Sequence, residues 1–543
     1  MKTMHVRRAI GLAGAGVLAA GLTVALPMGA AQAEPDPQPA ATGATWLATQ
    51  PVDGLINVKN EYDGEVFEGV DQGLSLDVAF ALNAVGGQGD TVTEILDAVA
   101  GEVEAGKYIQ GDEYDWQEPY DFQQVGYYSG ATAKTLTAAV ELGGDPTSFG
   151  GVDLVDRLEE LVTPSGRIED DSFFGDYANV IGQSFAVRGL QGAGDDASAA
   201  VADAVTEFLV LQQCDNGGFR LNFNGADAGC TDDADADPDA TSNALVALSS
   251  IETPDAEVEA ALADGTDYLL DIQKADGSFG GGTSTEESNS NSTGLAGSAL
   301  AALGETEAAT DAAAWVRAHQ LTGLTTCEAG IGADAGAIAY NDADAAAAAK
   351  DGIGDLERGV FVRAAAQALP VLTLTPAAVG DLAVKGKAGF IQAGSATKVT
   401  VTGLAAGERA CLTGGKAAVV VTGSGSATVT AKAGTGVRTL TLVTAGDATA
   451  QTTVSVLGKA KLKVQAAKKK VKKTKKNKIT VKGLVAGEKV KVALRGKKVA
   501  AGKANAKGVF KAKFKVGKKT GNAKVKAVGQ FANRKGATKF KVR

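Results

Sequence analysis

Histidine is scarce in this chain of 543 residues, which has only His5 and His319. A zinc site that activates a thiolate is built from Asp, Cys and His ligands, so one histidine beyond the N-terminal segment excludes that chemistry. Aromatic residues are also few, at 5% of the chain, which does not indicate a cavity whose aromatic walls stabilise cations. We expect neither a cofactor nor a resident metal ion.

Long apolar runs are lacking after the N-terminus. The one such run, residues 9–26, follows basic residues and precedes a small-residue motif that ends at Ala33, an arrangement typical of an export signal. We predict a signal peptide over residues 1–33, cleaved after Ala33, and a secreted or cell-surface protein without a membrane span. An uncleaved anchor is the alternative, and both Sec and Tat export stay open. Residues 34–45 are expected to form a Pro-rich linker.

The chain has only four cysteines. In an exported protein they can form disulfides. Cys214 and Cys230 flank one loop between predicted helices, and we predict that they pair, which would stabilise the fold by about 3 kcal/mol. Cys327 and Cys411 either join two domains or remain free thiols.

A repeated pattern is the most informative feature that the sequence does contain. Each copy has the end of an apolar helix, a Gln or its substitute, a turn centred on Gly and a second Ala/Leu-rich helix. The clearest copies begin at Phe208 and Tyr268, and degenerate copies begin near Trp46, Tyr108, Leu158 and Trp315. In such repeats each unit buries its apolar face only against its neighbours. We predict six helical hairpins over residues 46–370, arranged in a closed ring.

The helical periodicity ends at Pro370, and alternating Val, Thr and Gly residues follow. Residues 401–408 recur as residues 481–488, an offset of 80 positions. This pattern predicts two tandem β-sandwich modules, over residues 375–457 and 459–543. They resemble bacterial immunoglobulin-like repeats, which implies a role in spacing or attaching an exported domain.

Charge is divided between the two ends of the chain. From Lys459 to Arg543 there are 31 Lys and Arg residues against the single acid Glu488, a net charge of +30, whereas the rest of the chain has a net charge of −41. A cationic surface concentrates polyanions. Because the chain is expected to be exported, we predict that this segment binds anionic cell-envelope polymers and not nucleic acid. The alternative is a basic segment that only neutralises the acidic ring.

The segment from Gln273 to Gly280, Gln-Lys-Ala-Asp-Gly-Ser-Phe-Gly, resembles the repeat of the prenyltransferase and squalene cyclase superfamily. The resemblance covers about three fifths of the chain and implies an (α/α)6 toroid with its functional site at the mouth formed by the starts of the inner helices. Protein prenyl transfer is excluded by the missing zinc ligands.

The segment at residues 233–248 is similar to the acid motif of class II terpene cyclases. Asp237 and Asp239 match the first two Asp residues, and Ala240 replaces the third. This similarity implies Asp239 as a general acid assisted by Asp237. Two simpler interpretations compete with it: Asp239 and Thr241 cap a helix, or the alternating Asp residues bind calcium weakly.

We therefore predict a multidomain protein, an all-α (α/α)6 toroid followed by two all-β immunoglobulin-like sandwiches, that acts as a non-catalytic binding or adhesion protein. The alternatives are a degenerate class II terpenoid cyclase and, because cobalamin carriers share the toroid, a small-molecule carrier of that kind. The expected ligand is an unidentified small molecule or peptide. The candidate ligand-binding residues lie at inner-helix starts or facing loops: Gln123, Tyr127, Tyr128, Asn179, Gln183, Asp237, Asp239, Asn289, Asn291 and Tyr340.

Overall fold

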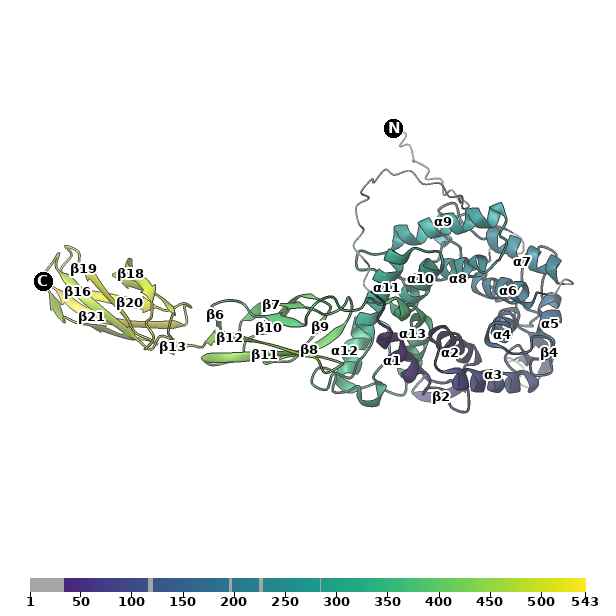
Figure 1. Ribbon diagram of the computed structural model, residues 1–543, viewed down its shortest axis with the longest axis horizontal. Helices are drawn as coiled ribbons and strands as arrows, with labels where there is room; N and C mark the ends of the chain where they lie inside the picture. Colours follow the sequence, from purple (N-terminus) through teal and green to yellow (C-terminus); the bar gives the residue numbers. More distant parts are fainter. Residues whose placement is uncertain (1–33, 116–120, 195–197, 224–227, 284) are drawn as a thin grey trace, which may run out of the picture.

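The computed structural model describes residues 34–115, 121–194, 198–223, 228–283 and 285–543. The predicted signal peptide and its cleavage site at Ala33 lie outside the described residues. Figure 1 shows a helical domain followed by two β modules in line, which confirms the predicted order of a helical domain and β domains. Within the described residues, no helix is both long and apolar enough to cross a membrane.

Six helices of the described chain contact one another in a closed sequence. They are α2 (Gln72–Val85), α4 (Ser129–Leu142), α6 (Val180–Ala193), α8 (Pro238–Ser249), α10 (Ser290–Ala302) and α13 (Arg358–Ala368). Each contacts the next, and α13 returns to α2. We call these the inner helices, and the helices α3 (Gly89–Glu104), α5 (Leu154–Glu160), α7 (Ala199–Leu211), α9 (Ala256–Ile272) and α11 (Thr306–His319) pack outside them (Figure 1).

The shorter elements of the helical domain connect these helices. They are α1 (Gln38–Leu47), α12 (Asp342–Asp351), the hairpins β1 (Asn57–Tyr62) with β2 (Glu65–Val70) and β3 (Gln110–Asp115) with β4 (Asp121–Tyr127), and the 3-10 turns η1 (Asp233–Asp235), η2 (Gly332–Asp334) and η3 (Pro370–Leu374).

The expected Pro-rich linker at residues 34–45 is wrong, because α1 begins there at Gln38. Proline is tolerated in the first helical turn, and the small side chains of Ala40 and Ala44 are buried against the helical domain. The chain before α1 is also fixed, since the Asp36 amide donates to the Thr375 carbonyl at 2.7 Å. The helical domain therefore starts before Trp46.

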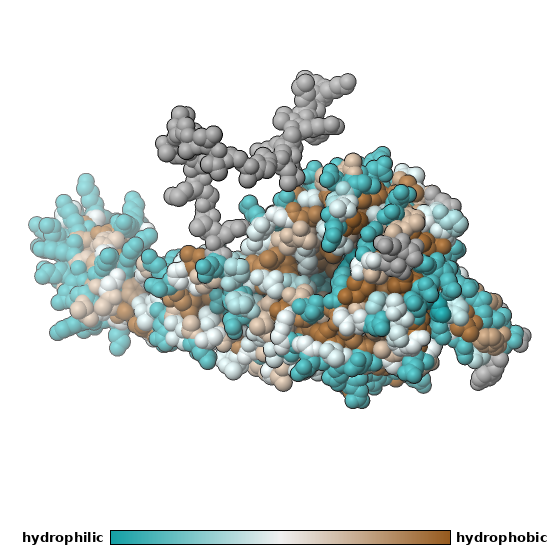
Figure 2. Space-filling model, turned by 45° about the vertical axis from the view of Figure 1, so that its right-hand side comes forward, coloured by the Kyte–Doolittle hydropathy of each residue, from teal (hydrophilic) through white to brown (hydrophobic). Residues whose placement is uncertain are grey.

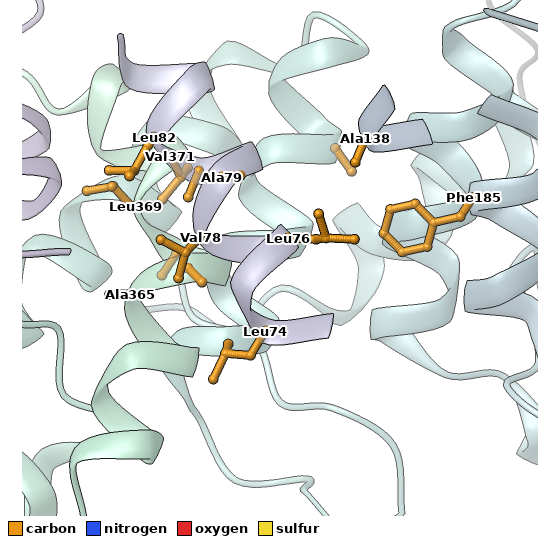
Figure 3. Close-up of a cluster of buried hydrophobic side chains, with 14 of the residues drawn as sticks. Leu74, Leu76, Val78, Ala79, Leu82, Ala138, Phe185, Ala365, Leu369 and Val371 are labelled. Atoms are coloured by element: carbon orange, nitrogen blue, oxygen red, sulfur yellow. The ribbon is translucent and has the colours of Figure 1, made fainter. Parts of the chain in front are cut away.

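The core lies between neighbouring inner helices. Figure 3 shows α2 side chains such as Val78 and Leu82 against Ala365 and Leu369, with Phe185 of α6 on the other side of α2. Small residues let the helices approach closely: a Cβ at Gly294 of α10 would collide with the backbone of α13. The many Ala and Gly residues of the repeats are therefore needed for close helix packing.

The repeated Gln and Gly residues hold the turn between adjacent units. Gln273 Nε2 donates to the carbonyls of Gly277 and Ala308, and Gly277 has a φ of +86° in a position where a Cβ would meet the backbone of α11. In the preceding copy the matching side chain is that of Gln213, which donates to Gly217 and Ala261. The repeated Gln and Gly residues therefore have a structural role at the junction of neighbouring units.

Each β module consists of two sheets around its own core. Module 1 contains β5 (Ala383–Lys385), β6 (Phe390–Gln392), β7 (Ala396–Thr402), β8 (Arg409–Thr413), β9 (Val419–Thr422), β10 (Gly425–Thr430), β11 (Gly436–Thr444) and β12 (Thr449–Leu457). Module 2 contains β13 (Ala460–Lys461), β14 (Lys463–Ala466), β15 (Lys470–Val471), β16 (Lys476–Lys482), β17 (Lys489–Leu494), β18 (Lys497–Lys503), β19 (Phe510–Lys515), β20 (Gly521–Val528) and β21 (Arg534–Val542).

The four cysteines form two disulfides. Cys214 and Cys230 pair as predicted, and Cys327 and Cys411 join the helical domain to module 1, so they are not free thiols. Beside the second disulfide, Arg409 of module 1 forms a buried ion pair with Glu328 at 2.6 Å and donates to the Ala318 carbonyl. Covalent and buried polar contacts therefore hold module 1 on the helical domain.

Candidate functional site

A cavity of about 360 Å³ lies at the centre of the inner helices, and all six of them contribute to its wall. Most of the wall is apolar, with Phe80, Ile181, Phe185, Val246 and Leu295 among the lining residues. Four charged side chains also line it: Asp77, Lys134, Arg188 and Asp239. An apolar pocket of this size with a few polar groups is a typical small-ligand site.

Both cationic side chains of the cavity are already paired. Lys134 Nζ lies 2.6 Å from an Asp77 carboxylate oxygen, and Arg188 donates two hydrogen bonds to Glu141. The Lys134 ammonium and the Arg188 guanidinium also lie 5.4 and 5.3 Å from the centre of the Phe185 ring. The aromatic face that lines the cavity is therefore occupied by the protein's own cations.

Asp239 is the one carboxylate of the cavity wall without such a partner. Among the described residues no group donates a hydrogen bond to its buried Oδ1 atom. Burial raises the pKa of Asp239 to about 6, the charge of Asp237 adds to the rise, and the Ser292 hydroxyl opposes it. The side chain therefore changes charge close to neutral pH.

Helix capping is the role of Asp237 and not of Asp239. Asp237 Oδ1 accepts hydrogen bonds from the amides of Asp239 and Ala240 at 2.8 and 2.9 Å, so Asp237 is the N-cap of α8. Thr241 fixes the preceding loop, since its hydroxyl accepts from the Phe219 amide and donates to the Asp237 carbonyl. The capping interpretation of Asp239 and Thr241 is therefore wrong, which leaves the Asp239 carboxylate available to a ligand.

The substitution Asp239→Asn should remove a pH dependence of stability. The pKa of Asp239 is higher in the folded than in the unfolded protein, so the free energy of unfolding falls as pH rises from about 4 to about 6. Above pH 6 the folded protein holds the buried negative charge of Asp239. We expect the variant to be about 2 kcal/mol more stable than the natural protein at pH 7.5, and about equally stable at pH 4. Urea unfolding followed by tryptophan fluorescence measures both values. Equal pH profiles for the two proteins would contradict the assignment.

A second pocket, of about 350 Å³, lies beside the start of α13 and contains the candidates Asn291 and Tyr340. The Oδ1 atom of Asn291 is buried and has no hydrogen-bond donor among the described residues. Burial raises the pKa of Tyr340, and the charge of Asp239 contributes, so these two residues lie within electrostatic range. Asp239, Asn291 and Tyr340 are the candidates that the fold brings together.

Three other candidates hold the helical domain together. Asn179 and Asn289 are the N-caps of α6 and α10. Gln183 is fully buried, donates to the carbonyls of Gly166 and Val205, and accepts from the amide of Ile168. The polar groups of Gln183 and the Oδ1 atoms of Asn179 and Asn289 are therefore engaged within the fold.

The last three candidates lie at the β3–β4 hairpin, and none lines the central cavity. Gln123 donates a hydrogen bond to the Asp121 carbonyl, and the Tyr128 hydroxyl donates one to Glu113. The Arg157 guanidinium lies over the Tyr127 ring, 4.4 Å from the ring centre. Asp77, Lys134 and Arg188, which line the cavity, were not among the residues predicted from the sequence. A lone charge in the middle of an otherwise apolar helix was the signal that could have found them.

The calcium interpretation gains no support from the arrangement of side chains. In the chain as described, no group of three or more Asp, Glu, His or Cys residues is placed to hold a metal ion. Asp233 instead accepts a hydrogen bond from the Asn216 amide, and Asp237 caps α8.

No protein-family model and no curated protein matches the chain. Solved structures similar to it include the type II terpene cyclase MstE from Scytonema, at 10% identity over 62% of this chain and 97% of that one with a TM-score of 0.42. A wild-type glycosidase has 14% identity over 62% and 97% of the two chains, with a TM-score of 0.39. The fibronectin(III)-like modules of Clostridium thermocellum CbhA have 14% identity over 29% and 92%, with a TM-score of 0.18. At these values no activity transfers to this chain.

Proposed function

We propose that this chain is an exported binding protein. Its helical domain, an (α/α)6 toroid, holds a small-molecule or peptide ligand in the central cavity, and module 2, an immunoglobulin-like sandwich, attaches it to anionic polymers of the cell envelope. The two disulfides fit an oxidising, extracytoplasmic compartment.

The observation that carries the proposal is the unbalanced charge of module 2. Glu488, its only acid, is fully buried and forms a bidentate ion pair with the buried Arg534 at 2.7 and 2.8 Å. No carboxylate side chain of the module is left to neutralise its exposed lysines. Figure 2 shows hydrophilic side chains projecting on all visible sides of this module.

Lysines also lie directly opposite one another across the strands of module 2. The antiparallel pairs are Lys463 with Lys482, Lys476 with Lys515, Lys478 with Lys513, Lys489 with Lys503 and Lys524 with Lys539. Like charges in such positions destabilise a sheet. The arrangement therefore favours binding of a polyanion, which removes the repulsion.

The sheet formed by β14, β16 and β19 presents its lysines as a regular array. Strands lie about 4.8 Å apart, and side chains on one face repeat every ~6.8 Å along a strand. A linear polymer with regularly spaced negative charges contacts several ammonium groups at once on this face. The array consists of Lys463, Lys476, Lys478, Lys482, Lys511, Lys513 and Lys515.

Removing four charges of this array should release the protein from envelopes. The full-length variant K476Q/K478Q/K513Q/K515Q keeps the buried core of the module, because all four side chains are exposed. We expect at least tenfold weaker retention on isolated envelopes at ~0.1 M salt, since each anion contact contributes a salt-dependent term. The measurement is the bound fraction in a co-sedimentation assay.

A matched variant controls for the loss of charge itself. K385Q/K387Q/K398Q/K416Q removes four exposed lysines from module 1, where acidic residues are also present. It should bind envelopes as the natural protein does. Equal retention of the natural protein and both variants at low salt would contradict the proposal.

We favour a binding role of the helical domain over catalysis, because the protein's own cations already lie on the Phe185 ring of the cavity. A cyclase cascade requires free aromatic faces for its carbocations, whereas Lys134 and Arg188 already lie on Phe185. The raised pKa of Asp239 is the one observation that favours a degenerate terpenoid cyclase. We expect no product when the protein is incubated with squalene or geranylgeranyl diphosphate. A product that is lost in the variant Asp239→Asn would establish the enzyme instead.

A further inference from the structure

The helical domain exposes aromatic side chains in only three segments of the described chain, each of which leads into an inner helix. Tyr62 and Phe67 lie on the β1–β2 hairpin before α2, Tyr114 and Phe122 on the β3–β4 hairpin before α4, and Phe173, Phe174 and Tyr177 in the loop before α6. We call these seven residues the aromatic rim. Tyr62 and Tyr177 are 78% and 72% exposed, so they are not part of the core, and exposed aromatic groups at the starts of neighbouring inner helices indicate a binding surface.

Two parts of the aromatic rim are built into one surface. The buried Glu113 of β3 accepts hydrogen bonds from the Ser172 hydroxyl and the Phe173 amide, both at 2.6 Å. The Tyr127 amide also donates to the Asp171 carbonyl at 2.8 Å. The hairpin before α4 therefore fixes the aromatic loop before α6.

The three segments are strongly acidic. Residues 57–70, 110–115, 121–127 and 169–177 contain 12 Asp and Glu residues and one basic residue, Lys59. Of these acids, Glu113 is buried, and Glu169 and Asp176 pair with Arg167, which leaves nine for the surface. Lys59 is itself engaged by Asp355 and Glu68. An acidic surface with exposed aromatic faces fits a partner rich in lysine, because ammonium groups are attracted both to carboxylates and to aromatic rings.

A lysine-rich partner is part of this chain, but each molecule holds its own copy away from its rim. Module 1 is fixed to the helical domain by the Cys327–Cys411 disulfide and the Arg409–Glu328 ion pair. Gly458, between the modules, is fixed on both sides: its amide donates to Thr435 and its carbonyl accepts from Arg534. Figure 1 shows module 2 at the far end of the molecule, with module 1 between it and the helical domain.

We infer that a second copy of this chain docks its module 2 on the aromatic rim. The contact is head to tail, so a dimer keeps one free rim and one free module 2, and the assembly grows from both ends as an open chain. Because the same lysines would contact envelope polymers, a polyanion competes with the rim and separates the copies.

Sedimentation velocity of the full-length protein tests this inference. At ~0.05 M salt the average mass should rise with protein concentration, and at ~0.5 M salt the protein should be monomeric, because screening removes the attraction. The rim variant Y62S/F67S/Y177S and the lysine variant K476Q/K478Q/K513Q/K515Q should each associate at least tenfold more weakly. The control variant V379S/V437S, which changes two exposed valines of module 1, should associate as the natural protein does.

Mixing the two defective variants gives the sharpest result. The rim variant still offers an intact module 2 and the lysine variant an intact rim, so the mixture should form dimers and nothing larger. A mixture that stays monomeric, or a natural protein that stays monomeric at ~0.05 M salt, would overturn the inference. Loss of envelope retention in the rim variant would also overturn it in favour of a direct envelope contact. Envelope binding by module 2 is judged separately by the retention of the lysine variant.

Discussion

Replacing Glu488 with Gln should unfold module 2 under conditions in which the rest of the chain stays folded. The buried Arg534 guanidinium, which is 2% exposed, would lose its only counter-charge in a module that already carries a large positive charge. Breaking a buried ion pair from one side costs about 3–5 kcal/mol. Pulse proteolysis with trypsin in urea measures the change, because the 31 Lys and Arg residues after position 458 become cleavable when the module unfolds.

The equivalent residue of module 1 provides the matched control. Glu408 accepts a hydrogen bond from the Ala405 amide at 2.9 Å, as Glu488 does from the Val485 amide at 2.9 Å. Within the described chain Glu408 has no ion pair, so Glu408→Gln should cost at most about 1 kcal/mol. Equal effects of the two substitutions would show that the turn, and not the buried ion pair, stabilises the modules.

The second large effect is expected at the joint between the helical domain and module 1. The variant C327S/C411S should lower the free energy of unfolding by about 4–5 kcal/mol, because the disulfide closes a loop with a sequence separation of 84 residues. Guanidinium unfolding followed by tryptophan fluorescence measures this loss. Trp315 lies close to the joint, because its ring stacks on His319 and the neighbouring Ala318 carbonyl accepts a hydrogen bond from Arg409 of module 1.

The other disulfide gives the comparison for this prediction. Cys214 and Cys230 are separated by only 16 residues, so C214S/C230S should cost less, about 3 kcal/mol. If C327S/C411S left the unfolding of the helical domain unchanged, module 1 would be an independently mobile unit. The inference that each molecule holds module 2 away from its own rim would then lose its basis.

The order of domains and the Cys214–Cys230 pair were predictable because both depend on local patterns. Helical repeats, the change to period-two alternation after Pro370, and two cysteines that flank one loop are all visible over short stretches of sequence. The Cys327–Cys411 pair and the ion pair between Glu328 and Arg409 join positions about 80 residues apart, and no local pattern specifies such contacts.

The candidate site was predicted only in part, for a related reason. A polar residue at a helix start looks the same in the sequence whether it caps the helix or faces a cavity. Asp237 caps α8, whereas Asp239, only two positions further along, lines the cavity. The linker was misassigned because proline in a first turn and proline in a spacer look alike. The exposure of Tyr62 and Tyr177 depends on which faces the neighbouring units leave uncovered, and that follows only from the closed arrangement.

Attachment of the protein to a polyanion depends, in this proposal, on the charge of module 2. The most direct test is the affinity of the full-length protein for inorganic polyphosphate, measured by titration calorimetry at several salt concentrations. We expect log K to fall steeply and linearly with log salt. The variant K476Q/K478Q/K513Q/K515Q should reduce the slope by about 3, because each lost lysine–anion contact releases about one counterion fewer. An affinity that is independent of salt, or a slope unchanged in this variant, would contradict it.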